Sequence, residues 1–323
     1  MRVRVCFHDN CFDGAASAAL FTRFYRDRID PTAEVVYRGM AHKTGQVFPP
    51  GIFDGDDNAV VDFRYSPDPK LGWWFDHHVS AFVRAEDEAH FQADTSGHKF
   101  FDPKAKSCTR FLALTCADKF GFDLEPHREL IEWAEIIDSA AFASPAAAIE
   151  LREPALRIMA WIEQNHDRAA TERLIGLLAA ARPLEEIASS PFIAVPLERV
   201  LGEHRRALEV FRERTRLEGG VAIYDVSDTR LEAFNKFIPY YLFPECRFVV
   251  GVSLGASRAK VSVGSNPWLP RPSVNIAAIC QRYGGGGHPV VGAVSLGVGE
   301  IERAREVGAE ITRELIDAVA RGA

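Results

Sequence analysis

The residues best suited to chemistry follow a short aromatic run, Trp73–Phe75. They are Asp76, His77 and His78, which place a carboxylate and two imidazoles within one turn of chain. Divalent zinc and manganese accept both kinds of ligand. The same triplet could also be a solvated loop. The choice between these interpretations depends on whether other carboxylates are brought to the same place.

Two further predicted strands end at acidic or histidine side chains that could bind a metal. Residues 2–8 carry β-branched residues, are predicted to form a strand, and lead into the polar cluster His8-Asp9-Asn10. Asp13-Gly14 leads into a helix predicted from Ala15 to about Arg28, and a strand over residues 59–63 carries Asp62 at its end. If these strands and 73–75 form one parallel sheet, their carboxyl ends meet at one edge, where open α/β sheets place their sites.

Asp138 lies in a helix predicted over residues 125–143, within the otherwise apolar run 136–140. A buried carboxylate is costly unless it is paired or binds a metal. Each acidic residue alone could be a helix cap or a turn residue. Together, with a bridging carboxylate and imidazole partners, they could hold two metal ions. Two ions about 3.5–4 Å apart suit in-line attack on phosphorus.

The remaining pattern predicts a two-domain α/β protein. Further helices are predicted over 107–120, with Ser107 as N-cap, and over 151–182, 184–216, 273–283 and 299–321. Further strands are predicted over 35–37, 221–224, 247–254, 259–263 and 293–296. We expect a parallel-sheet domain over 1–185, a helical connector over 186–216 and a smaller α/β domain over 217–323.

Composition narrows the class of protein. The 323 residues are 47% hydrophobic and 26% charged, and the net charge is −7, which argues against a polycationic nucleic-acid binder. The six cysteines contain no Cys-x-x-Cys pair, which argues against a zinc ribbon or a disulfide framework and favours a reducing compartment. The N-terminus resembles no secretory signal, and no apolar run is long enough to cross a bilayer. We therefore expect a cytoplasmic protein without membrane contact.

At this point the sequence resembles the DHH phosphoesterases, the family named after the motif that Asp76-His77-His78 matches. The segment 8–14 is similar to the first motif of that family, Asp62 to its second and Asp138 to its fourth. The segment 284–288, Gly-Gly-Gly-Gly-His, resembles the Gly-Gly-Gly-His motif of the DHH-associated C-terminal domain. The resemblance extends from residue 3 to about 297 with matching order and spacing.

The resemblance implies two α/β domains with a cleft between them, and two divalent metal ions. We expect Mn²⁺, with Zn²⁺ or Mg²⁺ as alternatives. The expected metal ligands are His8, Asp9, Asp13, Asp62, His77 and Asp138. In the family's arrangement Asp62 bridges the ions, and Asp13, His77 and Asp138 complete one site. His78 faces the scissile phosphate, and we group Asp76 with it as catalytic.

Cys11 departs from the family pattern, because it stands where a second carboxylate is usual. A thiolate is a softer ligand and would favour zinc over manganese at that site. Alternatively, Cys11 does not coordinate, and His8 and Asp62 hold that ion more weakly. Spacing does not decide between His8 and Asp9 as the ligand.

The glycine run lets the backbone approach an anion closely and direct N–H groups toward it, although such a run is often a flexible turn. We expect a loop that, by resemblance, holds the phosphate or sugar end of a short nucleic acid. Gly264-Ser265 stands where the family often has an arginine-serine pair, so that arginine is missing. The expected substrate-binding residues are Gly285, Gly286, Gly287, His288, Ser265 and Arg258.

These features favour a phosphodiesterase that hydrolyses short oligonucleotides, dinucleotides or related small nucleotide phosphates by attack of a metal-bound hydroxide. One alternative is a pyrophosphatase or exopolyphosphatase. Another is a nucleotide-binding sensor whose catalysis is reduced by Cys11 and the missing arginine. The expected partner is a short single-stranded oligonucleotide or a small nucleotide phosphate. No obligate protein partner is indicated, and a homodimer is compatible with the sequence.

Overall fold

A computed structural model describes residues 1–41, 48–229, 231 and 234–322. The chain divides into two compact units. Unit 1 comprises Met1–Phe142 and Arg152–Val200, and unit 2 comprises Ala143–Leu151 and Leu201–Ala323. The division falls within the long helix α9 (Pro191–Arg214), where the sequence predicts a helical connector.

Unit 1 is built on a parallel sheet, as predicted. Its strands are β1 (Arg2–His8), β2 (Glu34–Met40), β3 (Asp57–Val61), β4 (Trp73–Asp76) and β5 (Lys99–Phe101). They lie in the order β2-β1-β3-β4-β5, and each neighbouring pair is parallel. The direction of winding reverses between β1 and β3, so the carboxyl ends of these two strands are where such a sheet places its site.

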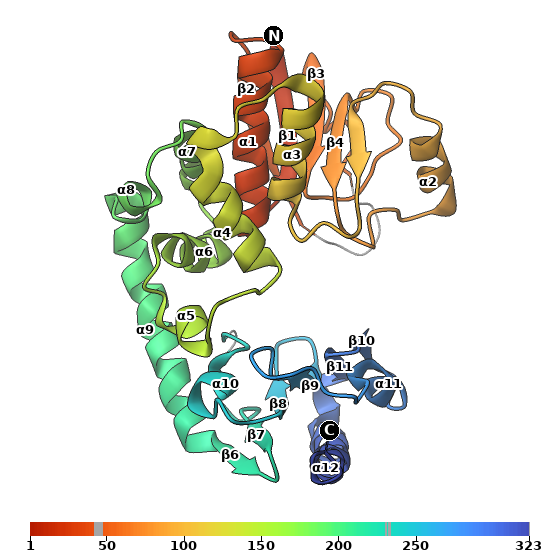
Figure 1. The fold of residues 1–323 in the computed structure, drawn as a ribbon, viewed down its shortest axis with the longest axis vertical. Helices are drawn as coiled ribbons and strands as arrows, with labels where there is room; N and C mark the ends of the chain where they lie inside the picture. The colour runs from red at the N-terminus through yellow and green to blue at the C-terminus, as the bar shows by residue number, and fades with distance from the viewer. Residues whose placement is uncertain (42–47, 230, 232–233, 323) are drawn as a thin grey trace. The chain divides into compact units, whose positions relative to one another are not determined.

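Both faces of this sheet are covered, as a parallel sheet requires. Helices α1 (Phe12–Arg28) and α3 (Cys108–Phe120) pack against each other and against β1, β3 and β4 (Figure 1). The small residues of α1 are almost all buried, which lets the helix lie close to the strands. Another hydrophobic cluster contains Cys6, Val60 and Trp74, and Phe91 of helix α2 (Ala85–Gln92) packs against it.

Trp74 is the side chain in this cluster whose loss should destabilise unit 1 most. It is 0% exposed, and its indole N–H donates a hydrogen bond to the carbonyl oxygen of Phe63 at 2.9 Å. We expect Trp74→Ala to lower the free energy of unfolding by about 3–5 kcal/mol. Urea denaturation measures this change. Val79→Ala is the control, because Val79 is 81% exposed and its loss should cost less than about 0.5 kcal/mol.

The remaining helices of unit 1 differ from the prediction at their ends. They are α4 (Arg128–Asp138), α6 (Pro154–Gln164), α7 (Arg168–Ala179) and α8 (Leu184–Ala188), with a 3-10 turn at Glu125–His127. The helix predicted to reach residue 143 ends at Asp138, since Ala140 takes a positive φ of 53°. The helix predicted over 151–182 is two helices, because Asp167 accepts hydrogen bonds from Ala169 N and Ala170 N and so begins α7.

Unit 2 is built on a mixed sheet. Its strands are β6 (Thr215–Glu218), β7 (Val221–Asp225), β8 (Phe248–Leu254), β9 (Ala259–Ser265), β10 (Gly286–His288) and β11 (Val291–Leu296). The order is β10-β11-β9-β8-β7-β6, in which β7 and β8 are parallel and the other pairs antiparallel. Residues 215–216 were expected to be helical, but they begin β6, which pairs with β7.

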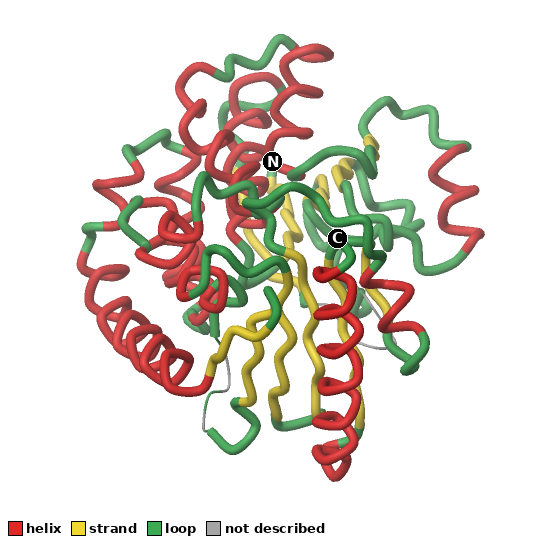
Figure 2. The backbone as a smooth tube through the Cα atoms, turned by 60° about the horizontal axis from the view of Figure 1, so that its bottom comes forward, coloured by secondary structure: helices red, strands yellow, loops and turns green. Residues whose placement is uncertain are grey.

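Helix α12 (Ile301–Ala320) runs along this sheet and packs on β8, β9 and β11 (Figure 2). Its buried face includes Val307, Ile311 and Leu315, as the predicted amphipathic helix requires. The other helices of unit 2 are α5 (Pro145–Glu150), α10 (Ile238–Leu242) and α11 (Ile276–Gln281). Across the described ranges, no helix combines the length and apolar character needed to cross a membrane.

The glycine run was expected to be a loop, and this prediction is wrong for Gly286–His288, which form strand β10 against β11. The reason is close backbone packing. A Cβ on Gly287 would lie 2.2 Å from the carbonyl oxygen of Val291, and a Cβ on Gly285 would lie 2.2 Å from that of Ala293. These two glycines are therefore needed by the strand pairing itself, whatever they bind.

Candidate metal centre

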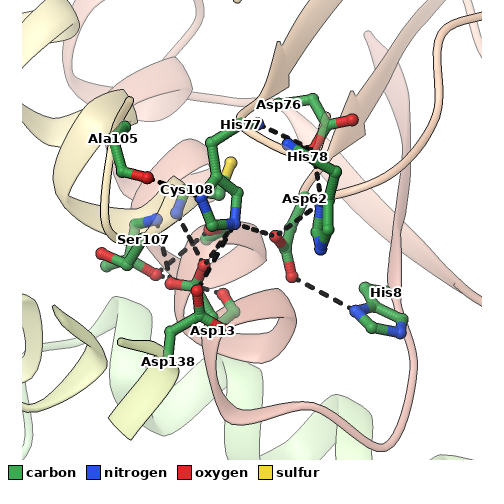
Figure 3. Close-up of polar contacts among 12 residues, drawn as sticks. His8, Asp13, Asp62, Asp76, His77, His78, Ala105, Ser107, Cys108 and Asp138 are labelled. Carbon is green, nitrogen blue, oxygen red and sulfur yellow. Dashed lines mark hydrogen bonds and ion pairs between the residues drawn. The ribbon is translucent and has the colours of Figure 1, made fainter. Parts of the chain in front are cut away.

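The carboxyl ends of three neighbouring strands bring the predicted metal-binding residues together. His8 ends β1, Asp62 follows β3, and Asp76 ends β4, so that His77 and His78 come next (Figure 3). Asp13 in the first turn of α1 and Asp138 at the end of α4 reach the same place.

Asp62 lies at the middle of this cluster and is 1% exposed. Its Oδ2 is 3.5 Å from His8 Nδ1, and its Oδ1 is 3.5 Å from His77 Nε2 and 3.8 Å from His78 Nδ1. No donor in the described part of the chain makes a well-formed hydrogen bond to either oxygen. Its φ of 55° is left-handed and strained for a residue other than glycine. A buried carboxylate in this state needs positive charge beside it.

His77 directs one ring nitrogen toward three carboxylates. Its Nδ1 lies 3.0 Å from the carbonyl oxygen of Ala105, and donation of Nδ1–H to this oxygen leaves Nε2 facing the cluster. Nε2 lies 3.5 Å from Asp138 Oδ2 and 3.8 Å from Asp13 Oδ2. Histidines that bind metals are usually held in this way. Burial lowers the pKa of His77, but the contact with Asp62 and the bond to Ala105 raise it to about 10.

Asp13 is held by the first turn of α3. Its Oδ2 accepts a hydrogen bond from Cys108 N at 2.6 Å, and its Oδ1 accepts one from Thr109 N at 3.0 Å. Burial raises the pKa of Asp13 well above its usual value, and the charges of Asp62 and Asp138 add to the effect. Burial and the charge of Asp62 also raise the pKa of Asp138. Carboxylates that repel one another in this way are stabilised when a divalent cation binds between them.

Asp76 is fully buried and positions the two histidines that follow it. Its Oδ1 accepts hydrogen bonds from His77 N at 2.8 Å and His78 N at 3.3 Å, and it lies 2.7 Å from His78 Nδ1. Burial lowers the pKa of His78, but the hydrogen bond to Asp76 and the charge of Asp62 outweigh it and raise that pKa. The Asp76 carboxylate therefore orients the His78 ring.

Asp9 lies apart from this cluster. Alternate residues of a strand face opposite sides, and Asp9 lines a cavity together with Phe7, whereas His8 lies beside Asp62. Cys11 does reach the cluster, and its Sγ lies within 4.8 Å of ligand atoms of His8 and Asp62. Burial raises the pKa of the Cys11 thiol well above its usual value, and the charge of Asp62 adds to this.

Three groups of side chains have the spacing needed to hold a metal ion, with one ligand atom of each residue within 4.8 Å of the others. The groups are His8, Cys11 and Asp62; Asp62, His77 and His78; and Asp13, His77 and Asp138. Asp62 belongs to two of them. Carboxylate oxygens and imidazole nitrogens suit Mn²⁺ and Zn²⁺, so the residues present fit the pair of divalent ions expected from the sequence.

Asp138 is not buried as expected, because its side chain is 27% exposed. The apolar run around it reflects the last turn of α4. The carbonyl group of Ala105 and the N–H groups at the start of α3 also support the site, and the sequence did not predict them. The predicted N-cap Ser107, which accepts a hydrogen bond from Arg110 N, was the available signal, since a helix N-terminus favours an anion.

The expected substrate-binding residues lie in unit 2. Ser265 ends β9, and its hydroxyl donates a hydrogen bond to the carbonyl oxygen of Val290 at 3.1 Å. Arg258 is exposed and donates a hydrogen bond to Ser295 Oγ at 3.3 Å. His288 is exposed at the end of β10.

No protein-family model and no curated protein matches the sequence. Solved structures do match. The pGpG-specific phosphodiesterase PggH of Vibrio cholerae has a TM-score of 0.65 at 19% identity, with 98% of this chain and 99% of that chain covered. The DHH domain of a member of the s1p family of ribosomal proteins has a TM-score of 0.56 at 12% identity, covering 96% and 86%. Exonuclease RecJ bound to manganese has a TM-score of 0.51 at 13% identity, covering 100% and 92%. The chain therefore has the α/β fold of these DHH proteins.

Proposed function

We propose that this protein is a DHH-family, metal-dependent phosphodiesterase acting on dinucleotides, short oligonucleotides or related small nucleotide phosphates. The observation that carries the proposal is Asp62, a buried carboxylate without well-formed hydrogen bonds among the described residues, surrounded by imidazoles and further carboxylates. The fold shared with a phosphodiesterase and an exonuclease supports the same reaction class.

We assign Asp62 as the carboxylate that two bound ions would share. Asp13, His77 and Asp138 complete one site, and His8 and Cys11 complete the other. When bound, the ions would neutralise charge on the phosphate and supply an attacking water at neutral pH.

His78 is assigned to the phosphate. Its Nδ1 is held by Asp76 at 2.7 Å, so its Nε2 is oriented by a buried carboxylate. With Nδ1 held by Asp76, the protonated ring would donate a hydrogen bond from Nε2 to a phosphate oxygen. A donor placed in advance stabilises the charge that develops in the transition state.

In unit 2, the assignment of Gly285, Gly286, Gly287, His288, Ser265 and Arg258 to phosphate or sugar binding stays a prediction. The exposed ring of His288 at the end of β10 supports it. The packing of Gly285 and Gly287 against β11 gives these two glycines a structural role as well.

The direct test is hydrolysis of the dinucleotide pGpG by purified protein in Mn²⁺, with release of mononucleotide followed by chromatography. A short single-stranded oligoribonucleotide, pyrophosphate and polyphosphate are assayed beside it. The proposal expects mononucleotide release that EDTA stops. Release of phosphate from pyrophosphate or polyphosphate alone would instead support an anhydride hydrolase. Binding without turnover of any substrate would support a sensor.

Cys11 should set the metal preference of its site. We expect Cys11→Asp to lower the zinc-to-manganese ratio bound from an equimolar mixture, roughly tenfold, because a carboxylate is a harder ligand than a thiolate. Elemental analysis measures the ratio, and the Co²⁺ form should lose its sulfur-to-metal absorption band. Cys116→Ala is the control, since Cys116 lies in α3 outside the three groups. An unchanged ratio with no sulfur band in the parent protein would show that Cys11 does not coordinate.

A further inference from the structure

One face of the sheet in unit 2 packs against α12, and the other face carries polar side chains. Ala259 and Val261 of β9 belong to the hydrophobic cluster that also contains Ile311 of α12. Neighbouring residues of a strand face opposite sides of the sheet. Lys260, which stands between these two core residues, therefore lies on the face opposite α12.

Strand pairing places a serine on either side of Lys260. Ser253 of β8 pairs with it on one side, and Ser295 of β11 pairs with it on the other. The next row toward β10 consists of small residues, Ser262, Ala293 and Gly286. We call this surface, made by Lys260 and these neighbours, the polar face. Lys260 is partly exposed, so a ligand on the polar face can reach its ammonium group.

Two further cations lie near Lys260. Arg258 is exposed and donates from Nη1 to Ser295 Oγ at 3.3 Å. Lys236 is exposed as well, and its Nζ lies 5.1 Å from the centre of the Phe237 ring. Burial lowers the pKa of Lys260, and the charges of Arg258 and Lys236 lower it further. Within the described ranges no carboxylate offsets this effect, so the three positive charges repel one another.

The carboxylate of Asp225, on the neighbouring strand β7, lies on the opposite face. It is in alternation with Val221 and Ile223, which pack in the cluster that α12 covers. Its Oδ2 accepts a hydrogen bond from Nε of Arg305, a residue of α12, at 2.8 Å. The cations of the polar face are therefore available to an anion from outside the chain.

Lys260 and His288 lie far apart on the same face of the sheet. His288 pairs with Val291 of β11, and Val291 pairs with Gly264 of β9. Gly264 follows Lys260 by four residues in β9, which corresponds to about 14 Å along a strand. One phosphate group cannot contact both side chains, so an anion at Lys260 is distinct from an anion at His288.

A phosphate monoester suits this group of cations. It carries about 1.5–2 negative charges at pH 7, whereas the phosphodiester link of a dinucleotide carries a single charge. The three candidate metal groups all lie in unit 1, and the phosphodiester that is cleaved is assigned to them. A terminal phosphate of the same substrate is then left for the cations of unit 2.

We propose that Lys260, Arg258 and Lys236 form an anion subsite that binds a terminal phosphate of the substrate. The proposal rests on the proposed function and deepens it, because it makes dinucleotides with a terminal phosphate the preferred substrates. It also adds Lys260 and Lys236 to the residues expected to contact the substrate in unit 2.

The test compares pGpG, GpGp and GpG, which differ only in a terminal phosphate. Binding to the full chain is measured by isothermal titration calorimetry in EDTA, and kcat/KM is measured in Mn²⁺. We expect one of the two phosphorylated dinucleotides to bind about tenfold more tightly than GpG, the size of effect expected for a hydrogen bond between charged groups. A preference for pGpG would assign the subsite to the 5′ end, and a preference for GpGp would assign it to the 3′ end.

Substitutions at Lys260 connect this preference to the polar face. Lys260→Gln should remove most of the preference, with the loss appearing in KM, and Lys260→Arg should keep it because the positive charge is retained. Arg313→Gln is the control, since Arg313 is an exposed cation of α12, on the other side of the sheet, and should leave the preference unchanged. Circular dichroism confirms that each variant is folded.

Equal affinity for the three dinucleotides would overturn the subsite, as would a preference that survives Lys260→Gln. Its failure is distinguishable from failure of the proposed function. If the three dinucleotides are hydrolysed with the same kcat/KM and bind alike, the phosphodiesterase stands and the subsite falls. If a phosphorylated dinucleotide is preferred through Lys260 and none is hydrolysed, the subsite stands and the phosphodiesterase falls.

Discussion

Asp62→Asn is expected to abolish hydrolysis, with a loss in kcat of about 10³-fold or more, as expected for a residue that places the charges around the reacting phosphate. The amide keeps the shape of the side chain and removes its charge. Asp62 Oδ2 lies 3.5 Å from His8 of one assigned site, and its Oδ1 lies 3.5 Å from His77 of the other, so both ions should be bound more weakly. Elemental analysis after gel filtration in limiting Mn²⁺ should then find less than one ion per chain.

The same substitution should also destabilise the metal-free protein at neutral pH. Burial opposes ionisation of Asp62, yet contacts with His77 and His8 and the charge of His78 hold its pKa below the usual value. A lowered pKa means that the ionised carboxylate stabilises the folded state. This contribution is present above the unfolded pKa and is lost as pH falls through the folded one. We expect a loss of about 1–3 kcal/mol in EDTA at pH 7.

Asp138→Asn is a matched comparison, because it should change the stability of the metal-free protein in the opposite direction. Burial and the charge of Asp62 raise the pKa of Asp138, so its charge opposes folding when no cation is present. Removing the charge should stabilise the metal-free protein by a few tenths of a kcal/mol, since solvent screens a partly exposed group. Metal binding should still weaken. Urea denaturation in EDTA compares the two variants, and a gain in stability from Asp62→Asn would contradict the assigned electrostatics.

The strand-end residues of the site could be predicted because their signals are local. A β-branched or aromatic run followed at once by a polar residue marks the end of a buried strand, and His8, Asp62 and Asp76 all stand at such ends. Once the strands are parallel neighbours, those ends must meet at one edge. The strand order of the sheet is therefore enough to explain why these three residues lie close together.

Strand alternation in the sequence already separates His8 from Asp9, although the spacing between motifs does not. Residues along a strand alternate between its two faces. Phe7 and Asp9 line the cavity, whereas Cys6 packs in the cluster of Trp74 on the other side. His8 shares the parity of Cys6, which separates it from Asp9.

Long-range contacts could not be predicted from the sequence. Asp13 is held by N–H groups of residues 108 and 109, which are 95 and 96 positions away in the chain. The glycine strand β10 forms because backbone groups of Val291 and Ala293 lie close to it. Short elements such as β5, α2 and α5 were missed because three to eight residues carry too little periodicity to identify them.

His77→Gln and His78→Gln should separate the two histidines of the motif by their effects on metal binding. His77 Nε2 faces Asp13, Asp62 and Asp138, so His77→Gln should lose both bound metal and activity. His78 is held by Asp76 and assigned to the phosphate. We expect His78→Gln to keep the metal content of the parent and to lower kcat by about 10²–10³-fold.

Metal content by elemental analysis and kcat on a dinucleotide are measured on the same preparations. His90→Gln is the control, because His90 pairs with the hydroxyl group of Tyr65 at 2.8 Å and belongs to none of the three groups. His78 is itself a member of one candidate metal group, with Asp62 and His77. If His78→Gln loses metal to the same extent as His77→Gln, His78 is a ligand, and the hydrogen bond to the phosphate must come from another residue.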